Sequence, residues 1–216
     1  MTAPTSDRML RAGFLRRGLR LEYLTVAWNI VEGAVAVTAA LAAGSVALLG
    51  FGVDSFVESI SGAVLIWRLR AERGDDDEDQ DAIAAVERYA ERLVGISFFL
   101  LASYIAGDAV WSLVERSKPE ASAVGMVLLV VSIGVMVWLA GAKRRTADAL
   151  GSRALHADAA QTLACWRLSV IALAGIGLNA AFGWWWADPV AALGISVLFV
   201  FEGLEAWRGD DDDHDD

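Results

Sequence analysis

Apolar residues along this 216-residue chain gather into six long runs, which are separated by short polar links. A helix needs about 20 apolar residues to cross the hydrocarbon core of a bilayer, and every run reaches or approaches that length. The predicted spans cover residues 22–43, 46–67, 93–114, 121–141, 155–181 and 189–207. The pattern therefore predicts an all-α, polytopic membrane protein with six transmembrane helices.

The links between the runs predict helical hairpins. Ala43-Gly44-Ser45 is the shortest link, and the stretches 118–120 and 184–189 are expected to have the same role. In the last link, Asp188 is expected to cap the final helix and Pro189 to be its first residue, because aspartate and proline favour those positions.

Positive charge fixes the predicted orientation. Five arginines lie within residues 1–20, and the apolar run that follows is too long for a signal peptide, so we expect a basic segment followed by a retained first span. The links on the side of the N-terminus hold most of the other basic residues: Arg68, Arg70, Arg73, Lys143, Arg144, Arg145, Arg153 and Arg208. The opposite links hold only Arg116 and Lys118. Basic links stay in the cytoplasm, so both termini are predicted to lie there.

Composition supports the membrane class, since 56% of the residues are hydrophobic. The net charge of −10 is unevenly placed, because segments 75–81 and 210–216 hold 12 of the 28 acidic residues. We expect a six-helix domain, 21–208, with an acidic cytoplasmic loop, 74–81, and an acidic cytoplasmic tail, 209–216. Both acidic segments are either solvated or loosely collect cations. The charge argues against nucleic acid as a partner, and the single cysteine excludes an intrachain disulfide.

Two carboxylates interrupt the second run. Asp54 and Glu58 are four residues apart and therefore project from one face of one helix. Inserting a central aspartate costs about 2.5 to 3.5 kcal/mol, so both acids need partners. Small polar residues such as Ser55 and Ser59 surround them. We interpret this face as a cation site turned toward the protein interior. The alternative is a pair of buried acids that hydrogen-bond to neighbouring helices.

Polar residues interrupt other spans as well, and each is expected to face the bundle interior or water. They are Asn29, Glu32, Asp108, Gln161, Cys165, Arg167 and Asn179. Gln161 and Cys165 are again four residues apart. At 1.5 Å per residue, their depths overlap those of Asp54 and Glu58 near the midplane, where transporters place their sites.

Arg167 is an unusual residue for the middle of a span. It points about 200° round the helix from Cys165, so it is not expected to join the same face. A buried arginine needs an acidic partner, and Glu32 and Asp108 are the two candidates.

These motifs, in their order and spacing, resemble the cation diffusion facilitator family of metal transporters over about residues 20–207. That family has six spans, cytoplasmic termini, Asp-x-x-x-Asp on the second helix and His- or Asp-x-x-x-Asp on the fifth. The second-helix motif here reads Asp54-Ser-Phe-Val-Glu58, after Gly-Ser-x-Ala-Leu at 44–48. The pair Ala157-Asp158 sets the fifth-helix register, and the Trp-x-Asp-Pro lead into the last helix is also similar.

The resemblance implies that Asp54, Glu58, Gln161 and Cys165 bind a transported divalent cation, zinc or a related ion. We expect metal efflux by alternating access in exchange for protons, because metal and protons compete for the same deprotonated groups. Cys165 stands where the family has Asp, so the site reaches a charge of −3 only if this cysteine is a thiolate. That donor set suits zinc or a softer metal better than magnesium or calcium. Alternatively, Cys165 is a small buried hydrophobe and Gln161 an interhelical hydrogen-bonding residue.

Many family members carry a soluble metal-sensing domain after the sixth helix, whereas this chain ends nine residues after Trp207. We therefore expect a short form without that domain. A homodimer would then form through the membrane helices, and the small residues that permit close helix approach are Gly175, Gly177, Gly194 and Ser196. The expected location is the plasma (inner) membrane, as a multi-pass protein.

A non-transporting membrane scaffold, or a metal-binding membrane protein, is the alternative function. The sequence has no catalytic base, nucleophile pair or cofactor loop, so we expect neither an enzyme nor a resident cofactor. The expected partners are a divalent metal ion, protons, membrane lipid and a second copy of the chain.

Overall fold

A computed structural model describes residues 5–71, 80–120 and 122–208 of the chain. They form six helices: α1 (Thr5–Ala43), α2 (Val46–Ala71), α3 (Gln80–Glu115), α4 (Ala123–Leu150), α5 (Arg153–Phe182) and α6 (Ala187–Arg208). Each helix is long and apolar enough to cross a membrane, and no strand occurs among the described residues. The predicted six-helix membrane fold is therefore confirmed. The acidic tail lies outside the described residues, as does most of the acidic loop.

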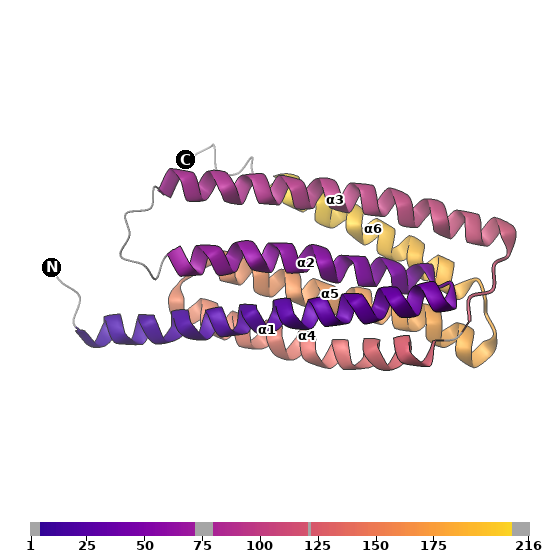
Figure 1. Ribbon diagram of the computed structural model, residues 1–216, viewed down its shortest axis with the longest axis horizontal. Helices are drawn as coiled ribbons and strands as arrows, with labels where there is room; N and C mark the ends of the chain where they lie inside the picture. Colours follow the sequence, from indigo (N-terminus) through magenta and orange to yellow (C-terminus); the bar gives the residue numbers. More distant parts are fainter. Residues whose placement is uncertain (1–4, 72–79, 121, 209–216) are drawn as a thin grey trace.

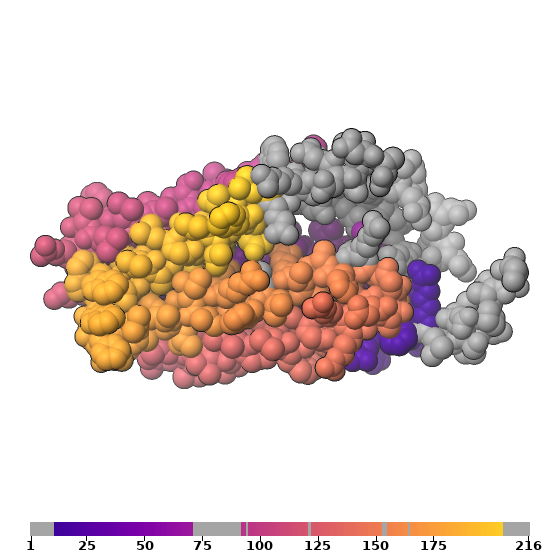
Figure 2. All heavy atoms as spheres, turned by 180° about the vertical axis from the view of Figure 1, so that it is seen from behind, coloured from indigo at the N-terminus to yellow at the C-terminus, as the bar shows by residue number. Residues whose placement is uncertain are grey.

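The helices lie side by side as a bundle of long rods (Figure 1). Three pairs pack most extensively: α1 with α2, α4 with α5, and α3 with α6. The α1–α4 contact joins the first two pairs into a four-helix group, which we call the four-helix bundle, and the α3–α6 pair lies alongside it. Figure 2 shows the opposite face, on which α6 lies between α3 and α5. The start of α1 and the end of α6 lie toward the same end of the molecule (Figure 1).

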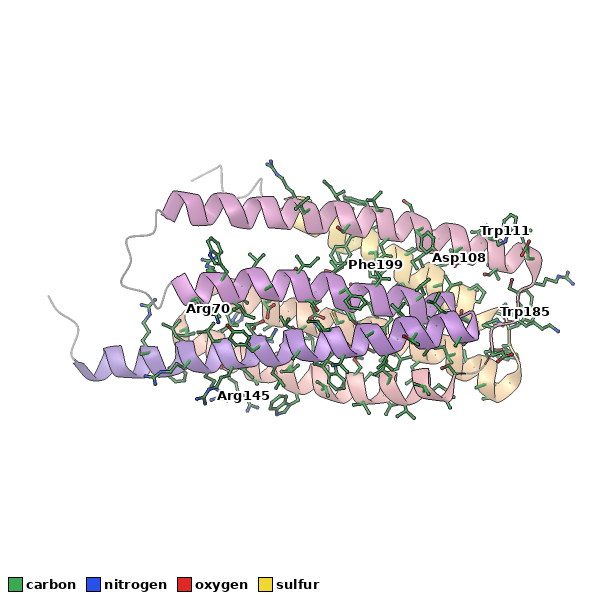
Figure 3. All side chains as sticks on the ribbon, in the orientation of Figure 1. Arg70, Asp108, Trp111, Arg145, Trp185 and Phe199 are labelled. Atoms are coloured by element: carbon green, nitrogen blue, oxygen red, sulfur yellow. The ribbon has the colours of Figure 1, made fainter. Side chains whose placement is uncertain are left out.

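The two ends of the bundle differ in their side chains. Figure 3 places Arg70 and Arg145 toward one end, and Trp111 and Trp185 toward the other. At the tryptophan end, the indoles of Trp184 and Trp186 stack with their centroids 5.3 Å apart. Basic residues at one end and tryptophans at the other are the distribution expected of a membrane protein with a basic cytoplasmic side and an aromatic belt at the opposite interface.

The first helix continues well beyond its apolar run. It begins at Thr5, inside the segment that the sequence marks only as basic. Leu15 and Leu19 are buried and join a cluster that includes Leu69 of α2 and Leu155 of α5. At the basic end of the bundle, the helices therefore form a second apolar core, and this core holds their ends together.

Small residues and caps set where the helices turn. Gly44 adopts φ +68° in the first hairpin, as the Ala-Gly-Ser link predicts. Gly151 and Gly183 end α4 and α5 in the same left-handed conformation, with φ of 65° and 68°. Ser122 and Ser152 cap the starts of α4 and α5 by accepting a hydrogen bond from a backbone N–H three residues later.

Asp188 caps a different helix from the one predicted. α6 begins at Ala187, so Asp188 lies in its first turn rather than at its cap. Its carboxylate instead accepts hydrogen bonds at the start of α2, from Ser45 Oγ at 2.5 Å and from the Val46 N–H at 3.0 Å. Asp188 is fully buried there. It therefore caps a helix 142 residues earlier in the chain, and it fixes the outer end of α2 against α6.

Close packing against α1 orients the acidic face of α2. A Cβ atom on Gly52 would stand 2.9 Å from the Cβ of Ala36, and one on Gly33 would stand 3.0 Å from the Gly52 carbonyl oxygen. The two backbones approach this closely only because both positions are glycine. With one side of α2 held against α1, Asp54 and Glu58 lie on another side, toward α5.

Candidate metal site

The two predicted acids of α2 are buried in the centre of the molecule. Asp54 is 4% exposed and Glu58 is 3% exposed. A carboxylate at such a position loses its hydration, so it needs a proton, a cation or hydrogen-bond donors nearby. The structure supplies one shared neighbour to both carboxylates, and that neighbour comes from α5.

Cys165 is this shared neighbour. Its Sγ atom lies 3.5 Å from Oδ2 of Asp54 and 3.1 Å from Oε2 of Glu58, with the thiol as donor. The cysteine is 5% exposed, and its register on α5 is the one predicted from the sequence. Sequence reasoning therefore brought together three side chains that the fold places in contact. Their separations along the chain are 107 and 111 residues.

Gln161 completes the predicted set from a position one turn away on α5. It is half-buried, and it lines a cavity of about 20 Å³ together with Asp54 and Cys165. A cavity of this size holds about one water molecule or one bare ion. The other lining residues come from α3, α5 and α6, and they are Phe98, Arg167, Leu168, Leu198 and Glu202. In the described part of the chain, no three His, Cys, Asp or Glu side chains are arranged around a common metal position.

The prediction for Arg167 is wrong. The residue is exposed rather than buried, and it lines this cavity together with Glu202. The described residues contain no ion pair between Arg167 and either Glu32 or Asp108. Glu32 is fully buried on α1 and bonds to Ser55 instead. A long arginine side chain reaches the edge of the bundle, so it does not need a buried partner.

A second charged cluster lies deeper toward the basic end of the bundle, and the sequence did not predict it. Lys143 of α4 is fully buried, and its Nζ donates to Glu22 Oε2 at 3.1 Å and to Thr162 Oγ1 at 3.1 Å. It also pairs with Asp158 Oδ2. We call these four residues the lysine cluster. Lys143 was expected among the loop charges of the basic side. In the structure it joins α1, α4 and α5 inside the protein.

The lysine cluster and the predicted metal site are neighbours. Asp158 lies seven residues before Cys165 on α5, which is about 10 Å along the helix axis. Thr162 lies between these two levels, bonded to Lys143 on one side and placed against Glu58 on the other. Polar groups therefore follow the inside of the four-helix bundle from its midplane toward its basic end.

The polar residues of α1 lie on the same inner side, as predicted. Asn29 and Glu32 are both 0% exposed. The Oε2 atom of Glu32 accepts a hydrogen bond from Ser55 Oγ at 3.3 Å, on the turn of α2 that holds Asp54. On the facing helices, Ser169 of α5 donates to Ser132 of α4 at 3.4 Å. Neither of these two serines was singled out from the sequence, because serine is common in membrane helices.

The site spans the weakest of the inner helix contacts. α2 packs far more extensively against α1 than against α5, and α5 packs far more extensively against α4 than against α2. The predicted ligands therefore come from two tightly packed helix pairs, α1–α2 and α4–α5, and they meet where these two pairs face each other. Such a site changes its shape when one pair moves against the other.

Comparison with known proteins identifies the family of this chain. Residues 23–208 match the family model of the cation efflux transmembrane domain. The chain belongs to the cation efflux family. The match covers every predicted ligand and reaches into all six helices, so the resemblance drawn from the motifs is confirmed, and the six long apolar helices make the chain a multi-pass membrane protein.

One curated relative can be compared in detail. An uncharacterized transporter of Synechocystis sp. is 29% identical over 177 residues, which make up 82% of this chain. The aligned part is 56% of that protein, so the chain spans little more than half the length of this relative.

Proposed function

We propose that the protein exports a divalent cation, zinc above others, in exchange for protons, and that Asp54, Glu58, Gln161 and Cys165 bind the ion. One observation carries this proposal: a thiol of α5 lies within 3.5 Å of two carboxylates of α2, all three nearly fully buried. No cationic side chain bonds to these two carboxylates among the described residues. A divalent cation would supply the missing charge.

The spacing of the donor atoms is compatible with a zinc shell. Zinc takes Zn–S distances of about 2.3 Å and Zn–O distances of about 2.0 Å in a tetrahedral shell, so its sulfur and oxygen ligands stand roughly 3.5 Å apart. The two sulfur–oxygen distances here are 3.5 and 3.1 Å. Modest side-chain movements would therefore place a zinc ion between these atoms, with the Gln161 amide oxygen as a fourth donor. Magnesium would instead demand six oxygen ligands.

Proton exchange follows from the chemistry of these donors. A metal binds the thiolate and carboxylate forms, so the thiol proton that now bonds to the two carboxylates must leave when zinc arrives. Protons and zinc therefore compete for the same atoms. If the site faces one side of the membrane at a time, this competition couples the two movements.

Transport into proteoliposomes tests the proposal. With an acidic interior and zinc outside, the proton gradient is expected to accumulate zinc above its external concentration, and a protonophore should abolish the accumulation. A control without protein measures the leak. Zinc flux that ignores the proton gradient would refute the exchange but leave zinc transport standing.

The alternative, a non-transporting scaffold or a metal-binding membrane protein, is separated by two measurements. Calorimetry on purified protein detects zinc binding, and the vesicles detect transport. Binding without flux favours the metal-binding protein, and neither binding nor flux favours the scaffold.

The proposal includes a homodimer in the plasma membrane. Of the four small residues considered for its interface, Gly175 already packs against Ala191 and Ser196 is buried within one copy. Gly177 has open space beside it, and Gly194 has only Ile171 within 4 Å. Mass measurement in nanodiscs tests the dimer, and a monomeric mass would refute it.

A further inference from the structure

Glu32 is a buried acid that the proposed metal site does not use. It lies on α1, is 0% exposed, and bonds through Oε2 to Ser55 Oγ. Its other oxygen, Oε1, makes no well-aligned hydrogen bond, although the Ser132 hydroxyl and the Trp28 indole lie near this carboxylate. No lysine, arginine or histidine pairs with Glu32 in the described part of the chain. An ionised carboxylate left in this way inside a membrane protein costs several kcal/mol, so the group must gain a proton or another cation.

Two further side chains next to Glu32 also have polar atoms without a well-aligned hydrogen bond. Asn29 is 0% exposed, and neither its amide oxygen nor its amide nitrogen has a partner. Trp28, one turn before Glu32, has an indole N–H that makes no well-aligned hydrogen bond but lies near the Glu32 carboxylate. Each unpartnered buried group costs about 1 to 3 kcal/mol. Asn29 and Glu32 are three residues apart on the buried stripe of α1, so their free atoms lie on one helix face and indicate a small polar ligand there.

We propose that Glu32, together with Asn29, is a proton-binding site separate from the metal site, and that it carries a proton of the proposed exchange. The inference rests on the proposed function. A proton needs one carboxylate oxygen and one acceptor or donor beside it, which this face supplies. A metal ion would need several ligands in a shell. Asn29 then accepts from the protonated carboxyl or donates to the ionised one.

The position of Ser55 explains how the two sites communicate. Its hydroxyl bonds to Glu32, and it stands one residue from Asp54 and three from Glu58 on α2. Among the ionisable groups buried on the inner side of the bundle, Glu58 and Asp54 of α2 are the ones close enough to Glu32 to interact with its charge, and Lys143, Cys165 and Asp158 are buried farther along α4 and α5. Bare carboxylates favour a proton on Glu32 by Coulomb attraction, and a zinc ion beside them disfavours it. By linkage, each proton on Glu32 weakens zinc binding to the same degree.

The substitution Glu32→Gln tests the inference, because glutamine keeps the size and the acceptor oxygen but does not titrate. Two vesicle assays separate binding from coupling. Exchange of internal for external zinc, without a pH gradient, is expected to stay within about threefold of wild type. Accumulation driven by the pH gradient is expected to fall at least about tenfold, since the coupling free energy of one proton site is lost. Asp108→Asn, a partly exposed membrane acid on α3, is the matched control and should change neither assay.

A second readout does not depend on transport. Zinc added to detergent-purified protein in weak buffer releases protons that a pH dye counts, and Glu32→Gln should release about one fewer proton per zinc than wild type. Glu32→Asp retains a titratable carboxyl and should keep the wild-type proton count. An equal loss in both variants would show that the size of the side chain matters rather than its proton.

Three other results would overturn the inference. They are unchanged accumulation in Glu32→Gln, loss of zinc exchange and zinc binding in that variant, and accumulation driven by sodium in place of protons. The second result would make Glu32 a metal ligand. If wild-type protein moves no zinc at all, the proposed function fails, whereas an unchanged proton count in Glu32→Gln refutes the Glu32 site alone.

Discussion

The four-helix bundle and the α3–α6 pair are built on opposite principles. The inner side of the bundle carries buried acids, a buried lysine and a thiol, with hydrogen bonds among them. The contact between α3 and α6 is apolar and close-packed: Phe98 and Phe199 stack with centroids 5.6 Å apart, and a Cβ on Gly203 would lie 3.2 Å from the Phe99 ring. Figure 3 shows Phe199 between the two helices.

The difference separates the region proposed to select the ion from the region that holds helices together by packing. Lipid is as apolar as leucine, so apolar contacts hold membrane helices together only through close packing. The α3–α6 pair uses that route and contributes only Phe98, Leu198 and Glu202 to the lining of the cavity at the metal site. The bundle accepts the cost of buried charge, and such cost is retained where ions are bound or moved. The experiments below test that division.

Removing a carboxylate from the bundle is expected to have the largest effect. Asp54→Ala and Glu58→Ala should each abolish zinc transport, a loss of more than about 100-fold. Mutating a residue that only supports a metal ligand already lowers metal affinity or activity by about 10- to 100-fold, so removing a ligand should cost more. Zinc uptake by proteoliposomes, at matched amounts of folded protein, measures it. Asp108→Ala controls for the loss of a membrane acid outside the bundle. Transport retained by both ligand variants would place the metal site elsewhere.

Breaking the lysine cluster should affect stability first. Lys143→Met leaves Glu22 and Asp158 buried without their cation, and removing one partner of a buried ion pair costs about 3 to 5 kcal/mol. Unfolding in mixed detergent and SDS measures the change. Adding Glu22→Gln and Asp158→Asn to the same protein removes the uncompensated charges, so it should recover most of the loss. A triple variant no more stable than the single one would mean that Lys143 acts through its packing.

The same measurement on the α3–α6 pair should give a smaller loss and leave transport intact. Phe199→Ala opens a cavity against Phe98, and in water-soluble cores such changes cost about 3 to 5 kcal/mol. Part of that figure is transfer from water, which a membrane helix does not undergo, so we expect about 1 to 3 kcal/mol. Zinc transport per folded molecule should equal that of wild type. A transport defect in a stable Phe199→Ala protein would contradict the division between the two regions.

The helices, and the proximity of three predicted site residues, could be found from the sequence because both follow local rules. Runs of apolar residues mark spans, and residues four apart share a helix face, so Asp54, Glu58 and Cys165 were expected to lie together, as they do, while their role as metal ligands stays a prediction. Lys143 was missed because it adjoins Arg144 and Arg145 at a span end, where lysines usually reach the interface. The available signal was its position on the buried stripe of α4 with Met136 and Leu139. Asp188 was misassigned because its partner is 142 residues away.

The smallest expected effect separates a ligand from a packing residue at Cys165. Cys165→Ser keeps the size and a weak oxygen donor, but it cannot supply the negative charge of a thiolate. We expect about a tenfold loss of zinc affinity, because an exchange of one soft anionic donor for a neutral oxygen weakens but does not remove the site. Calorimetry on purified protein measures the affinity.

Cys165→Asp completes this comparison, because it restores the charge with a hard oxygen. Its zinc affinity should stay near that of wild type, while its preference should shift toward manganese and away from cadmium. The shift is the decisive readout, since a cysteine that only packs between Asp54 and Glu58 has no influence on the ranking of metals. If Cys165→Ser binds zinc as wild type does and ranks the metals in the same order, the ion is held by the carboxylates, Gln161 and water. The soft character of the site, and with it the assignment of zinc over harder ions, would then be lost.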